Sequence, residues 1–117
     1  MLMLFSFLLT SCSLVDPLTK AQHLSDSGKF QEAINILEKE YKTKPESVPI
    51  KSLLAQAYSN YGISLCQDSS KLPREKYPLA KEQFSMALTL NPYLKDAKDM
   101  YETIEQIQKS LKENKLN

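Results

Sequence analysis

The side chains in this sequence best suited to nucleophilic or metal chemistry are the thiols of Cys12 and Cys66 and the imidazole of His23. His23 is the only histidine, and the carboxylate of Asp26, three residues on, does not make a metal site by itself. One histidine among many serines identifies no nucleophile–base pair, and two glycines cannot build a phosphate-binding loop. The sequence therefore predicts no catalytic site, no metal site and no bound cofactor, and a solvated surface position for His23.

Cys12 stands at the end of a short apolar segment. The chain begins with a run of mostly apolar residues to Leu9 and continues Thr10-Ser11-Cys12, so an aliphatic residue and two small residues precede the cysteine. This pattern resembles the lipobox of exported bacterial lipoproteins, whose signal peptide is removed and whose cysteine becomes the acylated N-terminus. The resemblance implies a signal peptide over residues 1–11, a covalent diacylglycerol and acyl lipid on Cys12, and a short linker over residues 12–16.

Lipid on Cys12 is the membrane anchor that this sequence favours. The apolar run is too short to cross a bilayer, which takes about 20 apolar residues. A buried N-terminal helix is the other alternative, but the run is apolar on every side and Asp16-Pro17 follows it. We therefore expect the protein in the bacterial cell envelope. Because no Asp directly follows Cys12, the resemblance favours the periplasmic face of the outer membrane over the cytoplasmic membrane.

Size and charge limit the remaining classes of function. The chain has 117 residues, and removal of the first 11 would leave 106, enough for one domain with a modest core. Fifteen Lys and Arg residues stand against 14 Asp and Glu residues, and Arg74 is the only arginine. A nucleic-acid-binding protein would concentrate basic residues on one face, so we expect no nucleic-acid partner. With Cys12 acylated, Cys66 has no cysteine to pair with and is expected as a buried free thiol.

Apolar residues recur at helical spacing through most of the mature chain, so the predicted fold is all-α. The expected elements are a short helix from Pro17 to Gly28, a helix from Phe30 to before Pro45, a helix with apolar residues from Ile50 to Leu65, a polar loop over 67–76, a helix from Leu79 to Asn91-Pro92, and a last helix over 97–111. The helical domain is thus predicted over residues 17–112, with a frayed tail over residues 113–117.

Two segments of the chain share one template. Each runs from an aromatic residue to an alanine three positions on, then to a large apolar residue four further and a proline eight further: Phe30-Ala33-Leu37-Pro45 and Tyr77-Ala80-Phe84-Pro92. This pattern resembles the tetratricopeptide repeat, a helix–turn–helix unit that stacks into a superhelix, and the resemblance covers most of the chain after residue 14. It implies a short α-α superhelix of two helix–turn–helix repeats and a C-terminal capping helix.

The third helix leaves its register within the repeat open. The signature residues of a repeat's first helix fit either Leu54, Ala55 and Tyr58 or Tyr58, Tyr61, Gly62 and Leu65. The alternative to the repeat as a whole is a generic five-helix bundle in which the shared spacing is coincidental.

By this resemblance, the first helix of each unit lines a concave surface on which extended peptides or helices bind. The lining implied here is small and polar: Gln22, Ser25, Asp26, Gln56, Ser59, Asn60, Asp99 and Thr103. The same residues equally fit the solvated faces of amphipathic helices. The hypothesis that follows is a non-catalytic adaptor that binds one or more proteins of the cell envelope and helps to assemble an envelope complex.

Two further hypotheses remain open from the sequence. A small-ligand-binding or peptidoglycan-binding envelope lipoprotein is the alternative function. A cavity around Tyr58, Tyr61 and Tyr101 would favour that alternative, whereas tight packing of these rings would not. A homodimer is compatible with the resemblance, because short arrays often pair their terminal helices.

Overall fold

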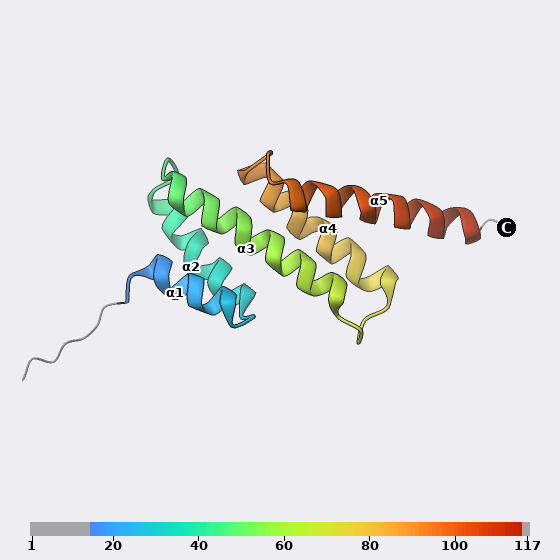
Figure 1. Ribbon diagram of the computed structural model, residues 1–117, viewed down its shortest axis with the longest axis horizontal. Helices are drawn as coiled ribbons and strands as arrows, with labels where there is room; N and C mark the ends of the chain where they lie inside the picture. The colour runs from blue at the N-terminus through green and yellow to red at the C-terminus, as the bar shows by residue number, and fades with distance from the viewer. Residues whose placement is uncertain (1–14, 116–117) are drawn as a thin grey trace, which may run out of the picture.

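The computed structural model describes residues 15–115, and the prediction of an all-α fold is confirmed for this range. Five helices follow one another along the chain (Figure 1): α1 (Pro17–Asp26), α2 (Phe30–Thr43), α3 (Val48–Gln67), α4 (Pro73–Leu90) and α5 (Lys95–Lys115). The predicted signal peptide, residues 1–11, and the predicted lipidation site, Cys12, lie outside the described residues. Within the described range, no helix is long and apolar enough to cross a membrane.

Side-chain caps and a glycine set where the first helices begin and end. The Asp16 carboxylate accepts a hydrogen bond from the Thr19 backbone N–H at 3.2 Å, and the Ser47 hydroxyl accepts one from the Ile50 N–H at 3.4 Å. A proline follows each cap within the first turn, where its missing N–H leaves no helical hydrogen bond unmade. Gly28, between α1 and α2, has a φ of 78°, in the left-handed region that glycine enters without a steric cost.

The helices pack in chain order, and the turns between them reverse the chain each time (Figure 1). α3 lies in the middle of the array, because it packs on α2 and α4 and also contacts α1 and α5. By contrast, no Cα atom of α2 comes within 8 Å of one in α4 among the described residues. α3 is therefore a neighbour in space of both α1 and α5, an arrangement compatible with a stack of helix hairpins.

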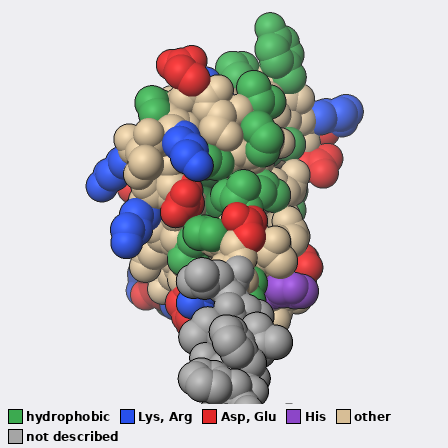
Figure 2. All heavy atoms as spheres, turned by 90° about the vertical axis from the view of Figure 1, so that its left-hand side faces the viewer, with side chains coloured by type: hydrophobic (Ala, Val, Ile, Leu, Met, Phe, Trp, Pro, Cys, Tyr) green, Lys and Arg blue, Asp and Glu red, His purple; other side chains and the backbone are tan. Residues whose placement is uncertain are grey.

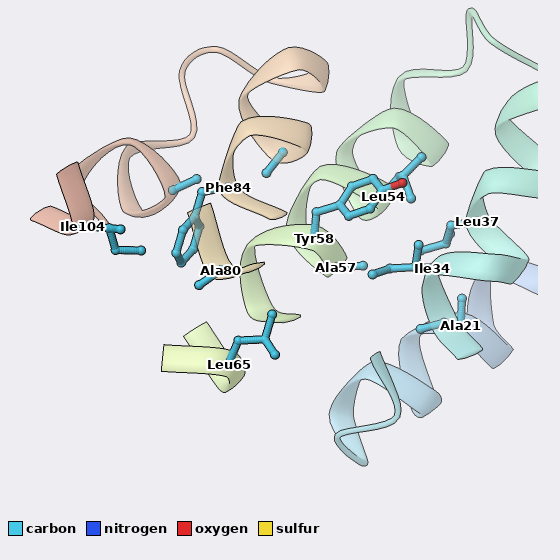
Figure 3. Close-up of a cluster of buried hydrophobic side chains, with 13 residues drawn as sticks. Ala21, Ile34, Leu37, Leu54, Ala57, Tyr58, Leu65, Ala80, Phe84 and Ile104 are labelled. Atoms are coloured by element: carbon cyan, nitrogen blue, oxygen red, sulfur yellow. The ribbon is translucent and has the colours of Figure 1, made fainter. Parts of the chain in front are cut away.

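Small and large side chains alternate in the core. Ala33 and Ala80, the alanines of the two matching segments, are fully buried, and so are the large residues that follow them, Leu37 and Phe84. Figure 3 shows Phe84 between Ala80 and Ile104, and Leu37 on the side of α2 that faces α3. Burying a side chain of this size contributes about 1.5–3 kcal/mol, and the neighbouring alanines let the helices come close enough to enclose it.

Gly62 lies at a close contact between α3 and α4. A Cβ atom built on Gly62 would lie only 2.8 Å from two ring carbons of Phe84, so α3 meets α4 here with no room for a side chain. Ser59, one turn earlier on α3, is fully buried. This close contact falls within the set from Tyr58 to Leu65, and Leu54, Ala55 and Tyr58 of the other set are also buried, so burial does not choose between the two registers.

Two boundaries differ from the prediction. α4 begins at Pro73, so the polar loop covers residues 68–72 and not 67–76. The Asp68 carboxylate accepts a hydrogen bond from the Ser70 N–H at 2.9 Å and closes this loop within a few residues. α5 continues to Lys115, three residues into the predicted frayed tail. Residues 111–115 are exposed, so helix propensity and lysines near the C-terminal end of the helix dipole stabilise this end in place of packing.

Candidate functional site

α1 and α3 together form a narrow crevice with uncharged polar side chains along its edges. Gln22 and Ser25 of α1 lie across from Gln56 and Asn60 of α3, and apolar residues complete the lining: the buried Ala21, Leu37 and Ala57 and the partly buried Leu53. The crevice encloses only about 20 Å³. Four of the eight residues predicted to line a binding surface are therefore brought together by the fold.

The crevice opens into a wider hollow toward the C-terminal half of α3. This hollow of about 420 Å³ shares Ser25 and Asn60 with the crevice and continues to Ser64 and Gln67, with Phe30 of α2 at its side. Sequence reasoning missed Ser64 and Gln67, although they follow Asn60 by four and seven positions and so lie on the same helix face. We call the crevice and this hollow together the polar groove.

Hydrogen bonds along each helix orient the amides of the polar groove. Gln22 Nε2 donates to Asp26 Oδ1 at 2.9 Å, and Gln56 Nε2 donates to Asn60 Oδ1 at 3.0 Å. Each pair spans four residues, which is the spacing at which side chains of neighbouring helical turns meet. An amide has two N–H donors and an oxygen that accepts two bonds, so each of these side chains keeps donors and acceptors for a partner.

The other four predicted lining residues, Asp26, Ser59, Asp99 and Thr103, do not line the polar groove. Ser59 is fully buried, and its hydroxyl has no hydrogen-bond partner among the described residues, so the prediction that it lines a surface is wrong. It is one position from Asn60 and hence about 100° around the helix, on the side that packs into the core. Asp99 and Thr103 are exposed on α5, where Lys95 pairs with Asp99 and the Thr103 hydroxyl donates to the Asp99 carbonyl at 2.8 Å. Neither lines the polar groove.

A second and more apolar hollow lies among α2, α3 and α4. It has a volume of about 430 Å³ and is lined by Glu38, Tyr41, Lys42, Leu54, Tyr58, Met86, Thr89 and Leu90. The space exists because α2 and α4 stand apart on either side of α3. We call this hollow the tyrosine groove.

One hydrogen bond crosses the tyrosine groove. The hydroxyl of the buried Tyr58 donates to Glu38 Oε1 on the neighbouring helix. Burial and the adjacent carboxylate both raise the pKa of the Tyr58 hydroxyl above its ordinary value, because both disfavour the phenolate. The two residues are 20 positions apart, so helical spacing alone gives no signal for this pair.

The three tyrosines expected around a ligand cavity, Tyr58, Tyr61 and Tyr101, do not line the same cavity. Tyr58 lines the tyrosine groove. The Tyr61 ring stacks on Phe30 with the two ring centroids 6.2 Å apart. The Tyr101 ring lies beneath the Lys81 ammonium, with Nζ 4.8 Å from the ring centroid. Tyr61 lines a separate hollow of about 230 Å³ beside Phe30, so no single cavity surrounds the three rings that the ligand-binding alternative needs.

The part of the chain that the structure describes offers little support for a metal site or a reactive thiol. No group of three or more His, Cys, Asp or Glu side chains there could hold a metal ion. The Cys66 thiol is half-buried, and burial raises its pKa although the nearby Lys76 ammonium acts to lower it. A raised pKa leaves less thiolate at neutral pH, and the thiolate is the reactive form.

Comparisons with known proteins identify no relative of this chain. No family model matches it, and neither does any curated protein or any solved structure. Its function therefore has to be inferred from its own geometry and residue patterns.

Proposed function

We propose that this protein is a non-catalytic adaptor of the tetratricopeptide type, anchored in the bacterial cell envelope by lipid on Cys12, and that it binds a protein segment in the polar groove. The observation that carries the proposal is the approach of Gln22 and Ser25 on α1 to Gln56 and Asn60 on α3. The tetratricopeptide assignment is supported by the matching segments in α2 and α4 and by the contacts of α3 with α1 and α5.

The spacing of polar side chains along α3 fits an extended peptide. Gln56, Asn60 and Ser64 follow one another by four residues, and Gln67 comes three residues later. Four residues of an α-helix rise about 6 Å, and two residues of an extended chain advance about 6.6–6.8 Å. Successive polar groups would therefore meet every second peptide group of a segment lying along α3. Such contacts would bind the peptide backbone of a partner more than its side chains.

Site-specific photo-crosslinking in cells tests the polar groove. A photoreactive amino acid at Gln56 or Ser64 is expected to capture one or a few envelope proteins from the membrane fraction. Asn35, which is exposed on α2 and lines neither groove, is the matched control position. The groove proposal fails if the control captures the same proteins equally well, or if neither groove position captures any protein.

Mass spectrometry of the protein extracted from membranes tests the anchor separately. The expected product begins at Cys12 and carries diacylglycerol on the thiol. A Cys12→Ser variant is expected to be lost from the membrane fraction. An unmodified chain that still begins at Met1 would contradict the anchor while leaving the polar groove to its own test.

The tyrosine groove favours one second function, the binding of a small envelope molecule such as a peptidoglycan fragment or a lipid. Its volume lies within the range of about 300–1,000 Å³ that is usual for ligand sites. Its lining combines apolar side chains such as Leu54 and Met86 with the Glu38 carboxylate. Digested peptidoglycan or phospholipid should then raise the melting temperature of the wild type but not of Met86→Trp, whose indole would fill the hollow. Equal shifts in both proteins would place the binding elsewhere, and no shift in either would remove this function.

A further inference from the structure

The position of α1 limits how a lipid on Cys12 can orient the domain. Five residue steps separate Cys12 from Pro17, the first residue of α1. Even when fully extended, five residues span at most about 18 Å. This step rests on the proposed acylation of Cys12. With lipid on Cys12, the end of the molecule where α1 begins is held close to the bilayer.

Contacts between α1 and α3 show which end this is. The two helices run in the same direction, because the chain reverses at both turns between them (Figure 1), and Ser25 lies close to Asn60. Pro17 precedes Ser25 by eight residues, and Ser52 precedes Asn60 by eight. Along the axis of α3, Pro17 therefore lies near the level of Ser52. At 1.5 Å per residue, the start of α3 at Val48 projects about 6 Å beyond that level, and the α3–α4 loop lies about 22 Å in the opposite direction.

The turn between α4 and α5 lies at the same end as Val48. α4 runs antiparallel to α3, and Leu90 near its C-terminus lines the tyrosine groove together with Leu54. Tyr93, three residues after Leu90, is 93% exposed, and Val48 is 76% exposed. These are the two most exposed large hydrophobic side chains of the described residues. We call residues 42–51 together with Tyr93 the tether end.

The chemistry of the tether end suits the surface of an anionic bilayer. Lys42, Lys44 and Lys51 flank Val48 in the sequence, against the single acidic residue Glu46. Figure 2 views the molecule from this side and shows hydrophobic side chains gathered along the middle, with lysine or arginine side chains on either side and acidic side chains interspersed among them. Tyrosine and short apolar tips favour the headgroup layer, and lysines near the surface attract anionic lipids.

We propose that the tether end lies against an anionic phospholipid bilayer, with Val48 and Tyr93 in the headgroup layer. The tyrosine groove then opens near the membrane surface. The wide part of the polar groove, at Ser64 and Gln67, points away from it. Protein partners thus reach the polar groove from the water side, and a molecule leaving the bilayer meets the tyrosine groove first.

A tryptophan introduced into this tryptophan-free chain reports its depth in a bilayer. The experiment uses the chain from Cys12 onward, which contains all five helices, with Cys66→Ser so that Cys12 is the single thiol. That thiol is coupled to a maleimide-bearing lipid in vesicles of phosphatidylcholine and phosphatidylglycerol with brominated acyl chains. Bromine is expected to reduce Val48→Trp fluorescence roughly two-fold, whereas Ser69→Trp, in the α3–α4 loop, should keep its intensity.

Any other outcome contradicts the proposed orientation of the domain on the bilayer. Quenching that is equal at the two positions, stronger at position 69, or absent from both would show that the tether end does not rest on the bilayer. Because the lipid is attached chemically, the result does not depend on whether cells acylate Cys12. Mass spectrometry of the cellular protein answers that question separately, so failure of the orientation and failure of the anchor are distinguishable.

Discussion

Gly62→Ala adds one methyl group at a close contact between α3 and α4. The new Cβ would lie 2.8 Å from two carbons of the Phe84 ring and 3.1 Å from a third, inside the normal carbon–carbon separation of about 3.5–4.0 Å. Phe84 is fully buried, so its ring cannot swing aside without displacing its neighbours. Overpacking costs about 1–3 kcal/mol, and replacing a helix-interior glycine by alanine stabilises by about 1 kcal/mol. The expected net loss is about 1 kcal/mol, or about 4–8 °C in Tm.

Thermal unfolding of the chain from Cys12 onward, followed by circular dichroism, measures this loss. The decisive comparison repeats the substitution in a Phe84→Leu background, where the ring is absent and the gain in helix propensity remains. There Gly62→Ala is expected to stabilise the fold by about 0.5–1 kcal/mol. If the substitution stabilises both backgrounds equally, Gly62 does not meet Phe84 and the described packing of α3 on α4 is wrong.

Gly28→Ala is the matched control for this cycle. No atom lies within 4 Å of a Cβ built on Gly28, but its φ is positive, so alanine there strains the backbone. The expected loss is about 1–2 kcal/mol, and it should be the same with or without the Phe84 ring.

Three further substitutions test other contacts by the same unfolding assay. Tyr58→Phe removes the hydroxyl that donates to Glu38 and is expected to cost about 1 kcal/mol. Because folding raises the pKa of Tyr58 above its ordinary value of 10.0, the unfolded chain loses that proton first. Wild-type stability should therefore fall as the pH rises above 10.0, and the variant should lack this component. Ser59→Ala removes an unpartnered buried hydroxyl and should leave stability unchanged or raise it by up to about 1 kcal/mol, whereas a large loss would reveal a hydrogen bond there. Ala87→Glu should abolish the helical signal, because it places a carboxylate at a fully enclosed position, and a folded variant would refute that burial.

The helices and much of the core could be predicted because helical periodicity is a local property of the sequence. The shared template correctly pointed to Ala33 and Ala80 as buried alanines with large apolar neighbours. Boundaries were less accurate where side-chain hydrogen bonds decide them. The polar loop ends early because the Glu75 carboxylate accepts a hydrogen bond from the Leu72 N–H at the start of α4, and periodicity carries no information about such a contact.

The candidate site was harder to predict because it depends on which helix faces meet. Gln56 and Asn60 do line the polar groove, but Ser59 beside them is buried, and a serine's polarity does not reveal the side of α3 that packs into the core. The tyrosine groove could not be predicted at all. It needs α2 and α4 to stand apart on α3, which is a property of tertiary packing and not of any one segment.

The missing contact between α2 and α4 also has a consequence for cooperativity. Since α3 alone joins the first two helices to the last two, local unfolding of α1 and α2 need not disturb α4 and α5. α1 contributes one buried residue, Ala21, whereas α3 contributes eight. The amides of α1 should therefore exchange with deuterium faster than those of α3, and uniform exchange across both helices would show one cooperative unit. A segment bound across the polar groove would bridge α1 to α3 and slow that exchange, so recognition and local stability would be linked.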